Sequence, residues 1–184
     1  MEEKRNFDLL TLGQVLLRLS PPNNDRLVRG DTFVKQVGGA ELNVAVGVAL
    51  LGLRTGVISK LPSHDMGSFM KGKIRSYGVS DDFFMYDDSP SARVGIYYYE
   101  NGAYPRKPKV IYDRANSSFY SLKIDEIPEK AYTASRCFHT SGITLALSPK
   151  VRETAIEMIK RFKAQGAIIS FDVNFRGNLW TGAE

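Results

Sequence analysis

The chain contains 184 residues and carries a net charge of +5, and hydrophobic residues make up 43% of it. This length suits one α/β domain, alone or with an appendage, and the hydrophobic content excludes wholesale disorder. The single cysteine, Cys137, excludes an intrachain disulfide, so we expect a reducing, cytoplasmic location and an inert thiol. The start, MEEKRNFDLL, is neither a secretory signal nor a membrane span, which argues against a membrane partner.

The charged residues argue against a nucleic-acid partner. The 25 basic residues are scattered among 20 acidic ones, and no nucleic-acid recognition motif is present. We therefore expect a solvated surface with a few cations around an anionic small molecule. The two histidines, His64 and His139, lie far apart without clustered ligands, so no metal site is expected, and His139 is interpreted as a core residue.

Strands and helices alternate in the first part of the chain. A nearly continuous apolar run predicts a buried strand at 7–13, and another strand is expected at 55–61. A helix is predicted at 66–78, where Gly78 provides a common helix stop. Such alternation predicts right-handed βαβ units and a parallel sheet.

The same alternation returns in the last third of the chain. A strand is predicted at 135–143 and a final buried strand at 167–174. Between them, Ser148 and Pro149 start a helix that runs to about Lys163, because serine is a favoured N-cap and proline fits the first helical position. The expected apolar stripe of this helix consists of Ala155, Ile156, Ile159 and Phe162.

Two regions interrupt the alternation, at about 15–37 and 92–114. Their strands have one apolar and one polar face, which suits a small sheet off the main body, such as a lid. The second region is expected to form a hairpin with a long, turn-rich tip. Side chains alternate along a strand, so at least one tyrosine of the run Tyr97–Tyr99 is expected to pack in the core or in a dimer.

The stretch QVGGAELNVAVGVALLG, at 36–52, joins flexible backbone to an apolar segment. Residues 42–51 are apolar on almost every side, so we expect a helix that is buried all round. Gly38 and Gly39 would let a polar ligand approach the unpaired N–H groups at the start of this helix, where Asn43 adds a donor and an acceptor. The alternative is a tight turn that needs only positive φ, and the spacing does not decide between the two.

Three ordered motifs carry a resemblance to a known family. GGAELNVA (38–45), SGITLALSP (141–149) and SFDVNFRGNLW (170–180) together resemble the PfkB/ribokinase family of carbohydrate kinases, and more narrowly its 2-keto-3-deoxygluconate kinases. The resemblance extends from about Phe7 to Trp180. It implies a Rossmann-like αβα sandwich with a small β-sheet lid that covers the sugar. Because such lids often pair between subunits, it also implies a homodimer.

The resemblance also implies which residues bind the substrate. The two glycines and the asparagine match the loop and helix start that contact the sugar, and Tyr97 matches a lid residue above it. Tyr112 and Arg114 match residues that bind a keto-sugar acid, where the planar fork of an arginine suits a carboxylate. Arg176 matches a further carboxylate or hydroxyl contact, and Ile143 would border the pocket. The predicted substrate-binding residues are Gly38, Gly39, Asn43, Tyr97, Tyr112, Arg114, Ile143 and Arg176.

Some of these residues have alternative roles. Arg114 could be a solvated charge at the end of a strand. Arg176 lies just past a buried strand, at the edge where open α/β sheets bind ligands. Asp172 lies at the same edge, and we expect it to order the turn at 172–178 rather than to touch substrate.

Two features depart from the family pattern. Gln14 stands where relatives usually have an acid that touches a sugar hydroxyl, so the hydroxyl preference stays open. The chain also ends at Glu184, before the glycine-rich GAGD turn that carries the catalytic aspartate in the family and before most of the nucleotide site. We therefore expect residues 1–184 to be the N-terminal portion of a ribokinase-like domain, with no catalytic residue and with an exposed edge strand near 167–173.

The leading hypothesis is the sugar-binding half of a kinase that uses ATP and Mg²⁺ to phosphorylate 2-keto-3-deoxygluconate or a close analogue. Phosphoryl transfer depends on groups around both donor and acceptor, so the isolated chain is expected to be inactive. One alternative is a non-catalytic fragment for sugar binding or dimerisation. Another is a specificity like that of ribokinase or fructokinase.

Overall fold

The main body is built on one parallel sheet. In the computed structural model, which describes residues 5–180, the strand order is β10-β9-β1-β4-β5, and β6 also pairs with β4. The pairings between these strands are parallel, as the alternation of strands and helices predicts. The strands are β1 (Phe7–Leu12), β4 (Thr55–Pro62), β5 (Val79–Ser80), β6 (Phe84–Asp87), β9 (Ser135–Ser141) and β10 (Ile168–Asp172).

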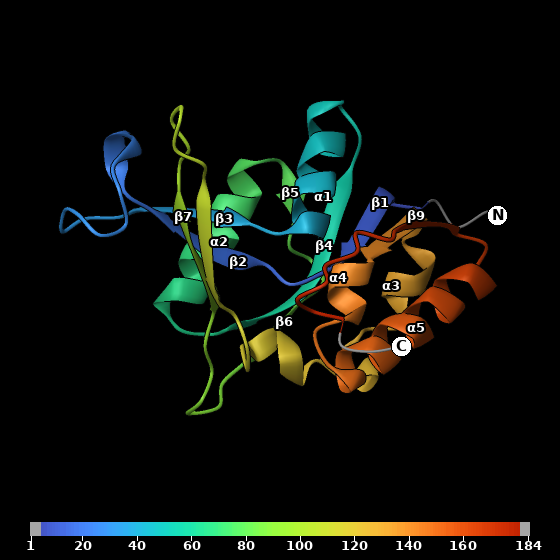
Figure 1. The fold of residues 1–184 in the computed structure, drawn as a ribbon. Coiled ribbons are helices and arrows are strands. Elements are labelled where there is room, and N and C mark those ends of the chain that lie inside the picture. The colour runs from blue at the N-terminus through green and yellow to red at the C-terminus, as the bar shows by residue number, and fades with distance from the viewer. Residues whose placement is uncertain (1–4, 181–184) are drawn as a thin grey trace.

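Helices cover both faces of this sheet and make the body an αβα sandwich (Figure 1). They are α1 (Ala40–Leu50), α2 (Asp65–Ser76), α3 (Lys130–Thr133), α4 (Gly142–Leu145) and α5 (Pro149–Ala164), with 3-10 turns η1 (Pro22–Asn24), η2 (Ser118–Ser121) and η3 (Ile124–Glu126). Helices α1 and α2 share one apolar cluster with β4, while α3 and α5 share the larger cluster on the opposite face. In the larger cluster, the rings of Phe138 and Phe162 stack with centroids 4.1 Å apart.

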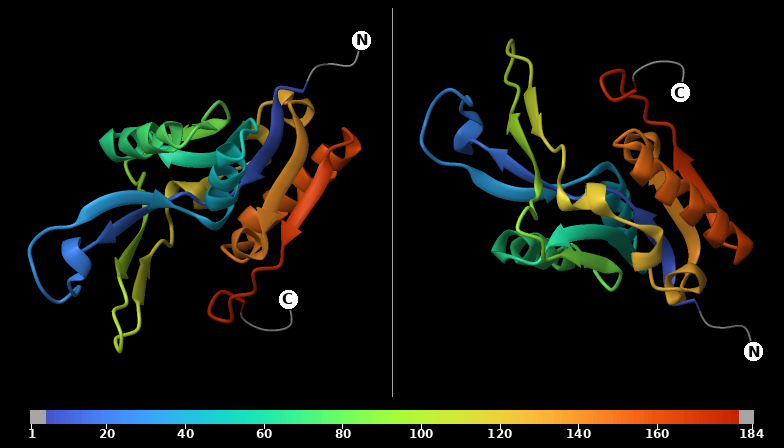
Figure 2. Two further views of the ribbon diagram at one scale, coloured as in Figure 1. Left: turned by 90° about the horizontal axis from the view of Figure 1, so that it is seen from above. Right: turned by 90° about the horizontal axis from the view of Figure 1, so that it is seen from below.

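A second sheet of four strands stands off from the body, and Figure 2 shows it projecting away from the layers of the sandwich. Its order is β3-β2-β7-β8, in which β2 pairs in parallel with β7 and the other two pairings are antiparallel. The strands are β2 (Leu16–Ser20), β3 (Val34–Gly38), β7 (Gly95–Glu100) and β8 (Lys109–Asp113). The small sheet expected beside the αβα body is therefore present.

Local sequence explains where the main helices begin and end. The side chain of Ser148 accepts a hydrogen bond from the backbone N–H of Val151 at 3.2 Å, and Pro149 is the first residue of α5, as predicted. Gly78 follows α2 with a φ of 77°, a conformation that glycine adopts without steric cost.

The expectation that the first helix is buried all round is wrong. Only Glu41, Leu42 and Ala45 of the described α1 residues are buried, whereas Leu50 is 80% exposed. The physical reason is that α1 packs against the sheet on one side, and no described element covers its other side. An apolar composition is compatible with burial of a helix on every side, but it does not show that other elements pack against the side facing away from the sheet.

The expectations for the last strand and the last helix need similar corrections. The strand at β10 is not buried, because it lies at the edge of the sheet with Ile168 70% exposed. This position confirms the expected exposed edge near 167–173. In α5, Ile156 is 39% exposed, and the core positions are instead held by residues that include Val151 and Met158.

Two other residues follow the sequence interpretation more closely. His139 is buried with its Nδ1 3.0 Å from Oγ of Ser170, which confirms it as a core histidine. Cys137 is half-buried, and burial raises the pKa of its thiol, so the less reactive protonated form is favoured. None of the described helices has the length and apolar character needed to cross a membrane.

Candidate functional site

Half of the predicted substrate-binding residues line one cavity of about 470 Å³. The cavity lies between the end of β8, the start of α4 and the loop after β10, at the edge where the carboxyl ends of β9 and β10 meet. The predicted residues that line it are Tyr112, Arg114, Ile143 and Arg176. The structure thus brings together residues from three separate segments of the sequence, the strand end at 112–114, the motif at 141–149 and the motif at 170–180.

Arg114 follows directly after β8 and is held by a neutral side chain. Its Nε donates a hydrogen bond to Oε1 of Gln14 at 2.7 Å, and its guanidinium carbon lies 5.6 Å from the ring centroid of Tyr112. Removal from water lowers the pKa of Arg114, and this effect is partly opposed by Tyr120, Tyr112 and Glu41. Among the residues that the structure describes, none forms a hydrogen bond or an ion pair with the two terminal nitrogens. These nitrogens are therefore available to a ligand in the cavity.

Gly38 lies against Tyr97, the predicted lid residue. A Cβ at Gly38 would be 2.6 Å from the hydroxyl oxygen of Tyr97, so only glycine leaves room for this side chain. Tyr97 pairs with Tyr112 across β7 and β8, and their ring centroids are 6.0 Å apart. Gly38 and Tyr97 therefore form a second group that reaches the cavity through Tyr112.

Gly39 and Asn43 lie at the start of α1. A Cβ at Gly39 would be 2.7 Å from the backbone oxygen of Gln14, so this glycine allows close approach of the turn after β1. The backbone N–H of Asn43 donates to the carbonyl oxygen of Gly39 at 2.9 Å, and the side chain of Asn43 is exposed. Neither residue lines the cavity, so their predicted contact with substrate stays a prediction.

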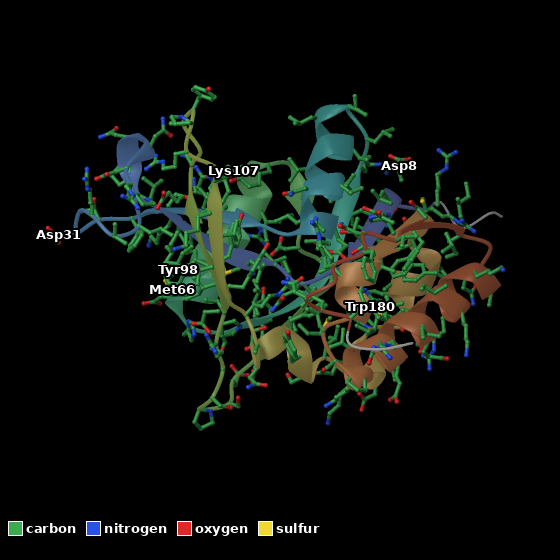
Figure 3. All side chains as sticks on the ribbon, in the orientation of Figure 1. Asp8, Asp31, Met66, Tyr98, Lys107 and Trp180 are labelled. Atoms are coloured by element: carbon green, nitrogen blue, oxygen red, sulfur yellow. The ribbon has the colours of Figure 1, made fainter. Side chains whose placement is uncertain are left out.

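Arg176 lies in the loop after β10, and the backbone of this loop is folded into a turn. The carbonyl oxygen of Arg176 accepts hydrogen bonds from the N–H groups of Leu179, at 2.8 Å, and Trp180, at 3.2 Å. Trp180, labelled in Figure 3, has the guanidinium carbon of Arg152 in α5 5.2 Å from the centroid of its ring. Arg176 lines the cavity from this loop, together with Asn178 and Leu179.

Asp172 orders the same loop, in agreement with its expected structural role. Its Oδ1 accepts a hydrogen bond from the backbone N–H of Asn174 at 2.9 Å. This contact between an aspartate and the N–H two residues later is typical of an Asx turn.

The sequence interpretation did not identify Glu41. Its side chain is 2% exposed, and its Oε1 accepts hydrogen bonds from Oγ of Ser141 at 2.5 Å and from Oγ1 of Thr144 at 2.7 Å. Glu41 thus ties the start of α1 to the start of α4, beside the cavity. The available signal was the acid itself, since it is the one charged residue in the stretch 36–52.

Tyr120 and Asn178 also line the cavity and were not predicted. Burial raises the pKa of Tyr120, although Arg114 opposes this effect, so the phenol remains a neutral hydrogen-bonding group. The cavity therefore combines two arginines with tyrosine and asparagine groups, and its one carboxylate among the described residues, Asp113, is paired through Oδ2 with Nη2 of Arg93 at 2.7 Å. This lining suits a small anion that also carries hydroxyl groups.

Residues 6–183 match the model of the pfkB family of carbohydrate kinases. The chain belongs to this family. The sequences of individual family members align with nearly the whole of this pfkB-family chain. The 2-dehydro-3-deoxygalactonokinase of Haloferax volcanii is 37% identical over 177 residues, which cover 96% of this chain and 55% of that protein.

Solved structures of related kinases have the same fold. The crystal structure of a 2-dehydro-3-deoxygluconokinase from Thermotoga maritima has a TM-score of 0.88 at 37% identity, covering 94% of this chain and 52% of that one. An uncharacterised sugar kinase from Pyrococcus horikoshii, solved in complex with ATP, has a TM-score of 0.81 at 26% identity, with coverages of 94% and 55%. The expected ribokinase-like fold is confirmed, and this pfkB-family chain spans about half the length of the curated relatives it matches.

Proposed function

We propose that this chain forms the sugar-binding part of a kinase that transfers phosphate from ATP to a hydroxyl group of a 2-keto-3-deoxy sugar acid. The observation that carries the proposal is the position of Arg114. Its terminal nitrogens are free of partners among the described residues, and it lines a cavity together with Arg176 and Tyr112.

A carboxylate is the ligand group that this arrangement favours. Burial of a cation costs free energy when no anion accompanies it, as the lowered pKa of Arg114 indicates. A bound carboxylate offsets that cost and can accept two parallel hydrogen bonds from one guanidinium group. The remaining polar groups, which include Tyr120 and Asn178, suit the hydroxyl groups of the same ligand.

The relatives support the same class of substrate. The Haloferax and Thermotoga kinases at 37% identity are named for 2-dehydro-3-deoxy sugar acids. The neutral-sugar alternative, a ribokinase- or fructokinase-like specificity, would leave the charge of Arg114 without a counterpart. We therefore favour a sugar acid as the substrate. A preference for a neutral sugar in the titration below would replace this assignment.

The use of ATP is supported by a related kinase that was solved with ATP bound. The expected Mg²⁺ accompanies ATP in this proposal. Among residues 5–180, no group of three or more His, Cys, Asp or Glu side chains is placed to hold a metal ion. The catalytic aspartate that the resemblance implies lies outside the described residues, and inactivity of the isolated chain stays a prediction.

The second sheet supports a homodimer as part of the proposal. Side chains alternate along a strand, so Val110 lies on the same face of β8 as Tyr112, and the pairing register places Val34 of β3 on that face too. Val34 and Val110 are 45% and 41% exposed. A second copy of the sheet would cover these two valines, and a non-catalytic dimerisation role would use the same face of the sheet.

Calorimetric titration tests the proposed substrate class. The wild-type chain is titrated with 2-keto-3-deoxygluconate and with fructose, with and without ATP-Mg²⁺. We expect tighter binding of the acid, and Arg114→Ala should weaken it by about 10- to 100-fold because hydrogen bonds to a charged group are lost. Arg136→Ala is the matched control, since Arg136 is exposed and lies at the opposite end of β9. Equal affinity for both sugars, or no effect of Arg114→Ala, would overturn the sugar-acid assignment.

A further inference from the structure

Arg93, two residues before the start of β7, holds the short segment that carries Arg114. Its Nη1 donates a hydrogen bond to the carbonyl oxygen of Ala115 at 3.2 Å, and its Nη2 donates to the carbonyl oxygen of Asp113 at 3.4 Å. Asp113 and Ala115 are the two neighbours of Arg114 in the chain. The planar set of donors on one guanidinium group therefore fixes the backbone on both sides of the residue that we propose binds a carboxylate.

The same guanidinium group pairs with the acid of the cavity. Nη2 of Arg93 lies 2.7 Å from Oδ2 of Asp113. Asp113 is the only acidic residue among the described residues that line the cavity. Without a partner, its negative charge would oppose the binding of a second anion there. Because the charges of the pair offset each other, the positive charges of Arg114 and Arg176 dominate the cavity.

The stability of the fold does not depend strongly on this ion pair. The side chains of Arg93 and Asp113 are 38% and 52% exposed, and pairs that are accessible to water contribute little to stability. The backbone of Arg93 is held independently: its N–H donates to Oγ of Ser118 at 3.2 Å, and its carbonyl oxygen accepts from the N–H of Ser118 at 2.9 Å. Substitutions of the Arg93 side chain leave these two bonds in place, so the pair is expected to matter for the cavity more than for folding.

We infer that Arg93 is a positioning residue for the binding of a sugar acid, an inference that rests on the proposed function. Arg93 does not line the cavity itself. It acts by holding the backbone around Arg114 and by offsetting the charge of Asp113. The hold on the backbone affects any ligand of this segment, whereas the charge of Asp113 affects an anion far more than a neutral sugar. Comparing an acidic with a neutral sugar therefore separates the two effects.

The test is a cycle of substitutions that removes each charge of the pair. Wild type, Arg93→Gln, Asp113→Asn and the double variant are each titrated with 2-keto-3-deoxygluconate and with fructose, and the ratio of the two association constants is taken. We expect the ratio of acid to neutral sugar to fall about threefold or more in Arg93→Gln, because Asp113 then faces the ligand without a partner. In the double variant neither charge remains, so the ratio should return to the wild-type value.

The outcomes separate the inference from the proposed function. A purely structural effect of Arg93→Gln would weaken both ligands together, and Asp113→Asn would not correct it. A ratio that is unchanged in Arg93→Gln, or that falls and is not restored in the double variant, overturns the inference and leaves the proposed function standing. No preference of the wild type for the acid overturns the proposed function, and the inference with it.

Asp113→Asn alone decides the matter if Arg93→Gln does not fold. Asp113 is exposed, so this substitution leaves no buried group without a partner. The ratio of acid to neutral sugar should then rise above the wild-type value, because Arg93 keeps its positive charge beside the cavity and no longer has a counter-ion. An unchanged or lower ratio in Asp113→Asn would overturn the inference.

Discussion

The contact between Gly38 and Tyr97 gives a prediction in which a second substitution reverses the effect of the first. A Cβ at Gly38 would lie 2.6 Å from the hydroxyl oxygen of Tyr97 but 3.5 Å from the nearest ring carbons. Only the hydroxyl group therefore blocks an alanine at this position. We expect Gly38→Ala to lower the free energy of unfolding by about 1–3 kcal/mol, the usual cost of overpacking.

The double variant Gly38→Ala/Tyr97→Phe should recover most of this loss, because the new methyl group then meets ring carbons at an ordinary van der Waals distance. Tyr97→Phe alone is the control, and its cost is expected to stay below about 1 kcal/mol. Urea unfolding followed by circular dichroism measures all four proteins, and a constant slope shows that the same transition is compared. If the losses of the two single variants simply add in the double variant, the hydroxyl group is not what excludes a side chain at Gly38.

Two further predictions concern the body and the second sheet. Burial lowers the pKa of His139 below its ordinary value of 6.5, although Glu41 and Asp172 oppose this. The unfolded chain therefore takes up this proton first, and the free energy of unfolding should fall as the pH drops below about 6.5, less steeply in His139→Gln. Urea titrations at pH 7 and pH 5 give the free energy of unfolding of both proteins, and an equal loss between these pH values in wild type and in His139→Gln would contradict this. Val110→Lys should convert a wild-type dimer into a monomer in light scattering, and a monomeric wild type would refute the dimer.

Local signals in the sequence predict most of the fold. The strands β1 and β4 follow from apolar runs, and α5 begins where Ser148 and Pro149 predict it. The exposure of α1 and β10 could not be predicted in the same way. Whether a helix or strand is buried depends on which other elements pack against it. An apolar segment does not show whether the described residues include an element that covers it.

The sequence predicted residues that line the candidate site, but not the residues that hold them in place by hydrogen bonds. Motifs identified Arg114 and Arg176, which both line the cavity. The contact of Gln14 with Arg114 and that of Glu41 with Ser141 each join residues 100 positions apart. No local pattern encodes such distant pairs. The tertiary arrangement of β1, α1 and α4 creates them.

The central claim is that a sugar acid binds in the cavity with its carboxylate on Arg114. A crystal structure of this chain with 2-keto-3-deoxygluconate tests this most directly. The account predicts the carboxylate within hydrogen-bond distance of the terminal nitrogens of Arg114, with the sugar chain between Tyr112 and Ile143. A sugar acid bound elsewhere, such as in the hollow of about 690 Å³ lined by Lys150 and Glu157 of α5, would contradict it.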